Sequence, residues 1–212
     1  MTSEPSITVI IPVLHEAAVI DGLIDSIRAV EGGGDVEVIV VDGDESNDTI
    51  SAMMRDDVIK SSSKRGRSHQ MNGGARIAKG DVLVFLHADT RLPNSGFNEI
   101  REALKDPEVI GGGFHLRFDP SNLYLRLIEL LNIPRVKITR VPYGDHAIIM
   151  RKGIFHQIGG YSDLLFMEDV ELMRLVRKKR MKIAILKGPV LTSSRRFRDD
   201  GYLKHSVRFF LF

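Results

Sequence analysis

The sequence contains no cysteine, and this absence excludes disulfides, thiolate metal sites and a cysteine nucleophile. Neither sign of charge is in excess, because 30 basic and 28 acidic residues leave a formal net charge of +2. This balance argues against a nucleic-acid partner. No apolar stretch reaches the ~18 uncharged residues of a transmembrane helix, and no basic stretch precedes the first apolar run as it would in a signal peptide. We therefore expect a cytoplasmic protein.

The composition is that of a globular domain. Hydrophobic residues make up 43% of the 212 residues and charged residues 27%, which excludes a disordered or fibrous chain. No linker, repeat or low-complexity tract divides the sequence, and its length suits one domain. We expect a single continuous α/β domain.

Strand and helix patterns alternate in the first half. Short apolar runs at Ile7–Ile11, Val36–Val41 and Val82–Leu86 are typical of strands buried on both faces of a parallel sheet. Helical patterns lie between them, over about 17–30, from Asn47 or Asp48 as the N-cap, and over Ser68–Ala78. This alternation predicts a doubly wound, mostly parallel sheet flanked by helices.

The second half is less regular. Its patterns predict strands at Val109–Phe118, Ala147–Met150 and Lys182–Leu186, and helices at Asn122–Leu131, near Gly153–Ile158 and at Met167–Arg180.

Polar residues follow three of the first-half strands, at Pro12–Glu16, Asp42–Asp44 and His87–Asp89. Ligands of open α/β sheets bind beyond the carboxyl ends of the strands, so we expect the site at this edge. Neither the glycine fingerprint of a dinucleotide site nor a P-loop is present, which disfavours both.

The stretch HADT, residues 87–90, places Asp89 at a strand end, where a carboxylate can hold a hard divalent cation against a diphosphate. An acidic loop or helix cap is an equal alternative for an isolated Asp. Basic residues follow in 64–81, where Arg65, Arg67 and a helix N-terminus could grip a phosphate, although a solvated basic face is favoured for the segment alone.

Two acids, Glu168 and Asp169, open a predicted helix, where caps are common but a rigid, ionised Asp is also a good general base. Further along, SSRRF at 193–197 brings Arg195 and Arg196 into a loop that suits a diphosphate or an acidic acceptor, with a salt-bridged surface as the alternative.

The order of the motifs resembles glycosyltransferase family 2. The matching stretches are TVIIPVLHE, VIVVDGDESNDT, GRSHQMNGGARIAKGDVLVFLHADTRLP, PYGDHAIIMRKGIFHQIGGY and FMEDVEL, over roughly 6–200. The sequence is most similar to a small branch of radical-SAM/selenodomain-associated transferases, whose FLHADT, GDQ, MEDVEL and SARR motifs run in the same order. The resemblance implies a GT-A type, Rossmann-like fold, a nucleotide-diphosphate sugar donor and an inverting displacement assisted by Mg²⁺ or Mn²⁺.

The resemblance also assigns roles on the donor side. It implies that Pro12 and Glu16 border the base and ribose, that Asp42 reads the nucleobase, and that Arg67 lies near base and phosphates. Asp44 adds negative charge near the base where the family usually has DGGSTDGT. The metal ligand is Asp89, the last acid of a D-x-D motif whose first position is His87 here.

On the acceptor side, the resemblance gives Asp145 to the GDQ element, which reads Gly144-Asp145-His146 here, and makes Asp169 the base with Glu168 beside it. Arg195 and Arg196 would assist the leaving diphosphate. We expect about 6–118 to bind the nucleotide sugar and about 119–212 to serve the acceptor.

Two other functions stay open at this point. A sugar-1-phosphate nucleotidyltransferase also combines an α/β sheet with a metal, but usually has a glycine-rich basic signature where Pro12–Glu16 stands. A non-catalytic nucleotide-sugar-binding protein is disfavoured by the joint presence of Asp42, Asp89 and Asp169.

The C-terminal stretch YLKHSVRFFLF, residues 202–212, predicts an amphipathic segment that needs a cover. Its cover could be the domain's own core, the second subunit of a homodimer, or the inner face of the membrane, where an acceptor could be lipid-linked.

Overall fold

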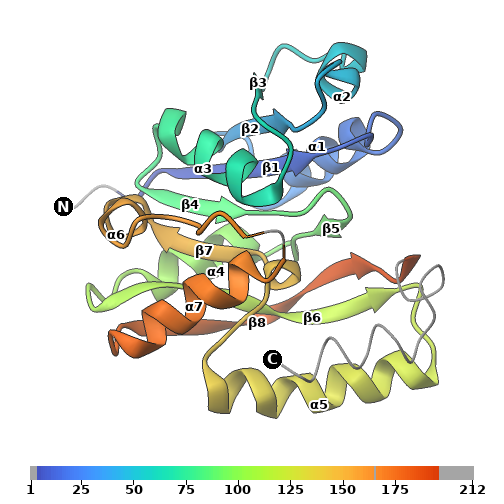
Figure 1. The fold of residues 1–212 in the computed structure, drawn as a ribbon. Coiled ribbons are helices and arrows are strands. Elements are labelled where there is room, and N and C mark those ends of the chain that lie inside the picture. The colour runs from blue at the N-terminus through green and yellow to red at the C-terminus, as the bar shows by residue number, and fades with distance from the viewer. Residues whose placement is uncertain (1–3, 165, 196–212) are drawn as a thin grey trace.

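The computed structural model describes residues 4–164 and 166–195, which form one eight-stranded sheet with helices packed against it (Figure 1). The strands are β1 (Ile7–Val13), β2 (Glu37–Asp42), β3 (Ile59–Ser62), β4 (Val82–Phe85), β5 (Thr90–Arg91), β6 (Val109–Asp119), β7 (Ile148–Arg151) and β8 (Lys182–Ser193). The helices are α1 (Ile20–Ala29), α2 (Asp48–Ala52), α3 (Arg67–Ile77), α4 (Gly96–Ala103), α5 (Leu123–Thr139), the 3₁₀ turn η1 (Gly144–His146), α6 (Lys152–Gln157) and α7 (Glu168–Lys178).

The strand order is β3-β2-β1-β4-β7-β6-β8-β5. Strands β3, β2, β1 and β4 pair in parallel, as do β6 and β8. Strand β7 runs antiparallel to its neighbours β4 and β6, and β5 runs antiparallel to β8. The predicted α/β class with a mostly parallel sheet is therefore confirmed.

The chain leaves β1 toward β2 and β3 on one side and returns to β4 on the other. The carboxyl ends of β1 and β4 thus flank the point where the strand order reverses, which is where open α/β sheets bind ligands. Every residue of β1 and of β4 is buried, as their continuous apolar runs predict for central strands.

Two predicted elements are longer in the structure. Helix α5 continues past Leu131 through Pro134 to Thr139, because four inward side chains hold it on the sheet despite the backbone bond that proline removes. Strand β8 continues past Leu186 to Ser193, although Gly188 and Pro189 should end it. A bulge absorbs the irregularity.

Helix α4, which the sequence analysis missed, contacts β8 at this bulge. The carboxylate of Glu99 on α4 accepts hydrogen bonds from the backbone N–H groups of Lys187 and Gly188, at 2.9 and 3.0 Å. The short strands β3 and β5 were also missed, since two to four residues carry too little pattern to be recognised.

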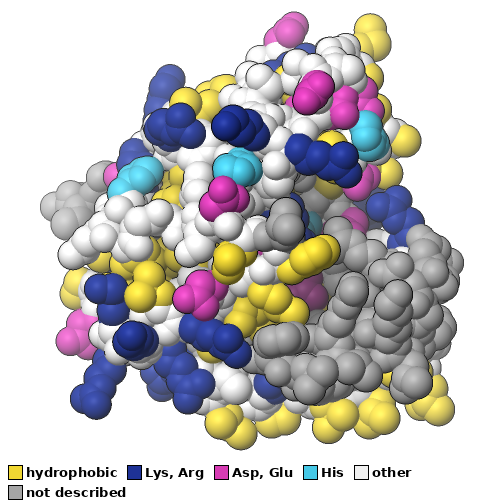
Figure 2. Space-filling model, in the orientation of Figure 1, with side chains coloured by type: hydrophobic (Ala, Val, Ile, Leu, Met, Phe, Trp, Pro, Cys, Tyr) yellow, Lys and Arg dark blue, Asp and Glu magenta, His cyan; other side chains and the backbone are white. Residues whose placement is uncertain are grey.

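Helix α5 runs along one end of the molecule, beside β6, with α2 at the opposite end (Figure 1). In the same orientation, hydrophobic side chains project along the edge where α5 lies (Figure 2). In the part of the chain that the structure describes, no helix combines the length and the apolar character needed to cross a bilayer.

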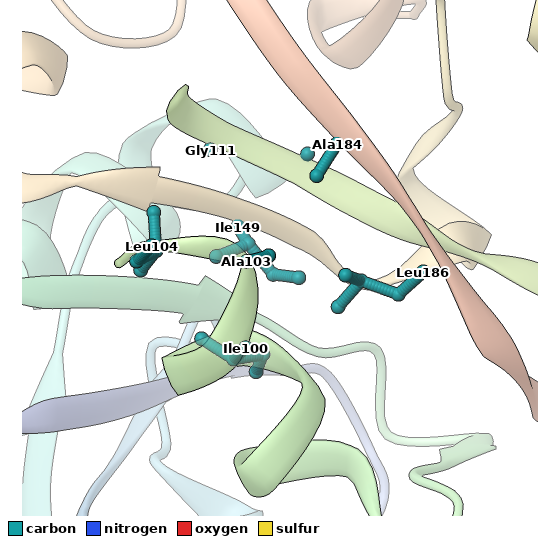
Figure 3. Close-up of a pocket in the computed structure, with 8 residues that line it drawn as sticks. Ile100, Ala103, Leu104, Gly111, Ile149, Ala184 and Leu186 are labelled. Atoms are coloured by element: carbon teal, nitrogen blue, oxygen red, sulfur yellow. The ribbon is translucent and has the colours of Figure 1, made fainter. Parts of the chain in front are cut away.

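One small cavity, of about 10 Å³, lies between α4 and the sheet (Figure 3). Its lining is apolar, with Ile100, Ala103 and Leu104 facing Ile149 and Ala184. A space of this size holds at most one water, and an apolar lining keeps it dry, so it is a packing gap and not a ligand site.

Two adjacent glycines on α3 differ in their surroundings. A Cβ on Gly74 would lie 2.5 Å from Cγ2 of Ile10 in β1, so this glycine lets the helix backbone pack directly on the sheet. A Cβ on Gly73 would meet only Cβ of Ser63, at 3.8 Å, which is ordinary contact.

We expect Gly73→Ala to raise the free energy of unfolding by about 0.5–1 kcal/mol, because alanine restricts the unfolded chain and favours the helix. Gly74→Ala should lower it by about 1–3 kcal/mol through overpacking, despite the same gain in helix propensity. Urea unfolding of the two variants measures both effects. Equal values for the two would show that α3 does not rest on β1 as described.

Candidate active site

The loop after β4 divides the site into two parts. Its backbone turns at His87, whose carbonyl accepts a hydrogen bond from Thr90 N at 3.1 Å. Asp89 lines an open cavity on one side. His87 is not among the residues that line this cavity, and its ring lies against Gly144 instead. The two residues of the H-x-D pair therefore serve different parts of the site.

The cavity beside Asp89 has a volume of about 240 Å³. Its lining includes the acidic residues Glu16 and Asp119 and the basic residues Arg91 and Arg195. Ser193 N donates a hydrogen bond to the Asp89 carbonyl at 3.0 Å, so the end of β8 fixes the loop. Carboxylate oxygens beside an open space suit a hard divalent cation, and the guanidinium groups suit phosphate oxygens.

Residues far apart in the sequence meet at this cavity. Nη2 of Arg195 lies 3.5 Å from Oε1 of Glu16, which joins the end of β8 to the loop after β1. Both are predicted donor-binding residues, and the structure brings them together. Pro12 is buried near the end of β1, where it pairs with Val41 of β2. Arg196 lies outside the described residues, as does the segment 202–212.

Asp42 is fully buried, and backbone amides occupy its carboxylate. Oδ1 accepts from Asp44 N at 2.9 Å, and Oδ2 accepts from Thr49 N and Ile50 N at 3.0 and 3.1 Å. Asp42 therefore caps α2 from β2, whereas the predicted cap residue Asn47 makes no side-chain cap bond. In this arrangement Asp42 holds the loop on which a base would rest, and its carboxylate does not face the cavity.

A second acidic cluster lies on that loop. Nδ1 of His15 lies 2.5 Å from Oδ2 of Asp48, and its Nε2 lies 3.7 Å from Oδ2 of Asp44. The hydrogen bond to Asp48 raises the pKa of His15, and the bond from Ser46 lowers the pKa of Asp44. These three side chains have the donor atoms and the spacing to hold a cation.

On the other side of the loop, Gly144 fits between two functional groups. Its N–H donates a hydrogen bond to Oδ2 of Asp169. A Cβ at this position would lie 2.9 Å from Cε1 and Nε2 of His87 and 3.2 Å from Oδ2 of Asp169. Only glycine leaves room here, so the His87 ring and the Asp169 carboxylate flank one point in space. The Asp169 carboxylate could act as a general base at this point and take a proton from a bound hydroxyl.

Asp169 does not act as a helix cap, contrary to the alternative that its place at a helix start suggested. Met167 is the N-cap residue of α7, and Asp169 in the first turn turns its carboxylate to Gly144. The hydrogen bond that it accepts from Gly144 N orients the carboxylate.

Glu168, only 2% exposed, makes an ion pair with Arg67, with Oε1 and Nε 2.8 Å apart. Burial raises the pKa of Glu168, and the guanidinium opposes that rise. The pair joins the first residues of α3 and α7. Arg67, predicted near the base and phosphates, thus has its Nε committed to Glu168 at the start of α7.

Asp145 follows Gly144, and about a quarter of its side chain is exposed. The next residue, His146, points inward. His146 is fully buried between Phe114 O, 2.7 Å from Nδ1, and Asn132 Nδ2, 3.1 Å from Nε2. Burial lowers the pKa of His146 to about 3, so its ring is neutral and forms no ion pair with Asp145. With these two partners, the neutral ring donates from Nδ1 to Phe114 O and accepts at Nε2 from Asn132.

The Asn132 side chain continues this network into α5. Its Oδ1 accepts from Nε of Arg135 at 2.8 Å, and the Arg135 guanidinium lies 3.8 Å from the centre of the Tyr143 ring. Helix α5 therefore positions both ends of the Tyr143–His146 turn.

The sequence analysis missed Asp48, Arg91 and Asp119 as site residues. Asp48 was taken as a helix cap, and Asp119 stands at the end of a strand in the irregular half. A strand-end position was the one available signal for Asp119, because its approach to Asp89 depends on the pairing of β6 with β8.

The model of glycosyl transferase family 2 matches residues 8–162, well over half of the sequence. The chain belongs to this family. The family 2 assignment is the one that the order of its motifs suggested.

Curated relatives cover only part of the chain. A PGL/p-HBAD biosynthesis glycosyltransferase of Mycobacterium bovis is 34% identical over 95 residues, which span 42% of this chain and 37% of that protein. An uncharacterised protein of Mycobacterium tuberculosis is 30% identical over 112 residues, spanning 50% of this chain and 35% of its own length. The chain thus matches little more than a third of each relative.

Solved structures share the fold over nearly the whole family 2 chain. A mannosyltransferase from Pyrobaculum calidifontis, in complex with GDP-Man and Mn²⁺, has a TM-score of 0.66 at 21% identity and covers 91% of this chain and 57% of its own. The mannosyl-3-phosphoglycerate synthase from Rubrobacter xylanophilus has a TM-score of 0.64 at 18% identity, covering 96% and 71%. These likenesses establish the GT-A type fold.

The buried His146 makes stability depend on pH. Its pKa is about 3 in the folded protein against an ordinary 6.5, so between these values the unfolded chain binds one more proton. The free energy of unfolding should therefore fall by about 1.4 kcal/mol for each pH unit below ~6.5 from this residue alone. Above that pH its contribution is fully present.

His146→Gln should remove this slope while keeping both hydrogen bonds, since an amide can donate to Phe114 O and accept from Asn132. Urea unfolding at several pH values between 5 and 7 measures it. His156→Gln is the matched control, because His156 is exposed and water reaches its ring in both states. An unchanged slope in His146→Gln would contradict the buried neutral ring.

Proposed function

We propose that this protein transfers a sugar from a nucleotide-diphosphate sugar to an acceptor hydroxyl, with inversion and with a divalent cation. The observation that carries the proposal is the division made by the loop after β4, with the Asp89 cavity on one side and the His87–Gly144–Asp169 contact on the other. A displacement needs leaving-group stabilisation and a base on opposite faces of the sugar, and this division supplies both.

On the donor side, the Asp89 cavity would receive the diphosphate. Glu16 in the cavity lining, with Pro12 near the end of β1, would border the nucleoside end, and Arg195 would offer its guanidinium to phosphate oxygens. The donor half, about 6–118, is completed by Asp119 and Arg195 from the following part of the chain. Membership of the radical-SAM/selenodomain-associated branch is part of this proposal and rests on motif order.

The residues around the cavity fit a cation, which we propose to be Mg²⁺ or Mn²⁺. Asp89 would hold it with a carboxylate oxygen, next to Asp119. Such an ion would neutralise the charge that develops on the leaving diphosphate. His87 would serve the acceptor side, since its ring packs on Gly144.

On the acceptor side, Asp169 would take the proton of the attacking hydroxyl. The Gly144 N–H holds its carboxylate in place, and the Glu168–Arg67 pair fixes the start of α7. Asp145 is partly exposed beside them, where it could orient the acceptor by a hydrogen bond. A fixed base needs no rearrangement when the acceptor arrives.

A matched pair of variants tests the cation site. A nucleoside diphosphate at a hundredfold excess over its Kd should stabilise the wild-type protein by about 2.7 kcal/mol in a thermal-shift measurement. Asp89→Asn should abolish the part of this stabilisation that depends on Mn²⁺. Asp48→Asn, in the His15–Asp44–Asp48 cluster, should keep it. The reverse result would move the cation to that cluster and remove Asp89 from the proposal.

Asp169→Asn tests the base. Asparagine can still accept from Gly144 N but cannot take a proton, so stability and diphosphate binding should hold while turnover falls by roughly 10²–10⁴. Release of nucleoside diphosphate from a panel of nucleotide sugars gives the rate. Glu171→Gln, an exposed acid in the same helical turn, is the control and should turn over normally. Normal turnover in Asp169→Asn would exclude it as the base.

A further inference from the structure

Helix α5 is apolar on two opposite faces. Its inner face packs Leu125, Ile128 and Val136 against the sheet, as expected for a surface helix. The opposite face should then be polar. Instead it carries leucine and isoleucine, and a water-exposed apolar face of this kind marks a surface that binds something.

The outward residues form one continuous stripe, at the helical spacing i, i+4, i+7, i+8, i+11 and i+15. Leu123 is 87% exposed, Leu130 65% and Ile138 79%. The stripe consists of Leu123, Leu127, Leu130, Leu131, Pro134 and Ile138. Helix α5 has seventeen residues and is therefore ~25 Å long, and the stripe follows most of this length along the edge where yellow side chains project in Figure 2.

Positive charge borders this stripe. Arg126, Lys137 and Arg140 are exposed residues of α5 and its C-cap. The one acid between Leu123 and Arg140 is Glu129, whose carboxylate turns inward to accept from Phe118 N at 2.8 Å. The outward surface therefore combines apolar side chains with basic ones and presents no acid of its own helix.

This charge pattern selects among possible occupants. A symmetric dimer would place the face against itself and bring its basic residues together without acids to oppose them. Residues 196–212 carry four basic side chains against two acidic ones, so they do not supply the opposite charge either. An anionic lipid surface supplies both a negative layer and an apolar layer beneath it.

We propose that the outward face of α5 docks this protein on an anionic lipid bilayer. The helix would lie in the plane of the interface, with the leucine stripe inserted and Arg126 and Lys137 at the headgroups. Its inner face holds the Tyr143–His146 turn through Asn132 and Arg135, so docking would place the acceptor side of the site near the lipid. The surface would bind reversibly, since it inserts only one side of one helix.

Co-sedimentation of the full chain with vesicles tests the proposal without any sugar donor, so its outcome is separate from that of the catalytic proposal. Wild-type protein should bind vesicles of phosphatidylglycerol and phosphatidylcholine at low salt, and pure phosphatidylcholine at least about fivefold more weakly. Leu127→Ser with Leu130→Ser should lower the partition coefficient about tenfold or more. Arg126→Gln with Lys137→Gln should do the same by loss of charge.

Met54→Ser is the matched control, because Met54 is 95% exposed and lies just after α2, at the other end of the molecule (Figure 1). It should bind like wild type, and a chain lacking residues 196–212 should bind within about twofold. Absence of vesicle binding by the wild type, or binding that the leucine variant retains, would overturn the proposal. So would loss of binding only on deletion of 196–212, or a dimer that the leucine variant converts to monomer.

Discussion

The close approach of the Gly144 backbone to the His87 ring and the Asp169 carboxylate couples the regular and irregular halves of this protein. His87 lies just after β4, Gly144 precedes β7, and Asp169 lies in the first turn of α7. A Cβ at Gly144 would displace the His87 ring and crowd the Asp169 carboxylate. The contact places the His87 ring beside Gly144 and Asp169, whereas Asp89 of the same loop lines the cavity.

Three buried polar side chains, Asp42, Glu168 and His146, have different kinds of partners near the site. Three backbone N–H groups donate to the buried Asp42 carboxylate, and the buried Glu168 carboxylate lies against the Arg67 guanidinium. Burial lowers the pKa of His146 and holds its ring neutral, and its two nitrogens have neutral hydrogen-bond partners. Each arrangement fixes a loop at low cost in free energy, whereas an unpaired buried charge would be strongly destabilising.

The surface of α5 extends the same connections outward. The side chains of Asn132 and Arg135 hold the Tyr143–His146 turn, and residues one turn away on the opposite face of the helix form the exposed apolar stripe. If the helix docks as proposed, these side chains would fix the position of the turn relative to the lipid surface. Such attachment would suit transfer to an acceptor held at that surface, since orientation is a large part of rate acceleration.

The sequence by itself determined the α/β class, the three central strands and the edge where Pro12–Glu16, Asp42 and His87–Asp89 gather, because buried parallel strands align their carboxyl ends. Only the tertiary structure decided which way those side chains point. Arg67 meets Glu168 and Glu16 meets Arg195 across long stretches of chain, and Asp42 turns inward to amides seven and eight residues away. Local periodicity predicts strands and helices, but contacts between distant residues depend on how those elements pack.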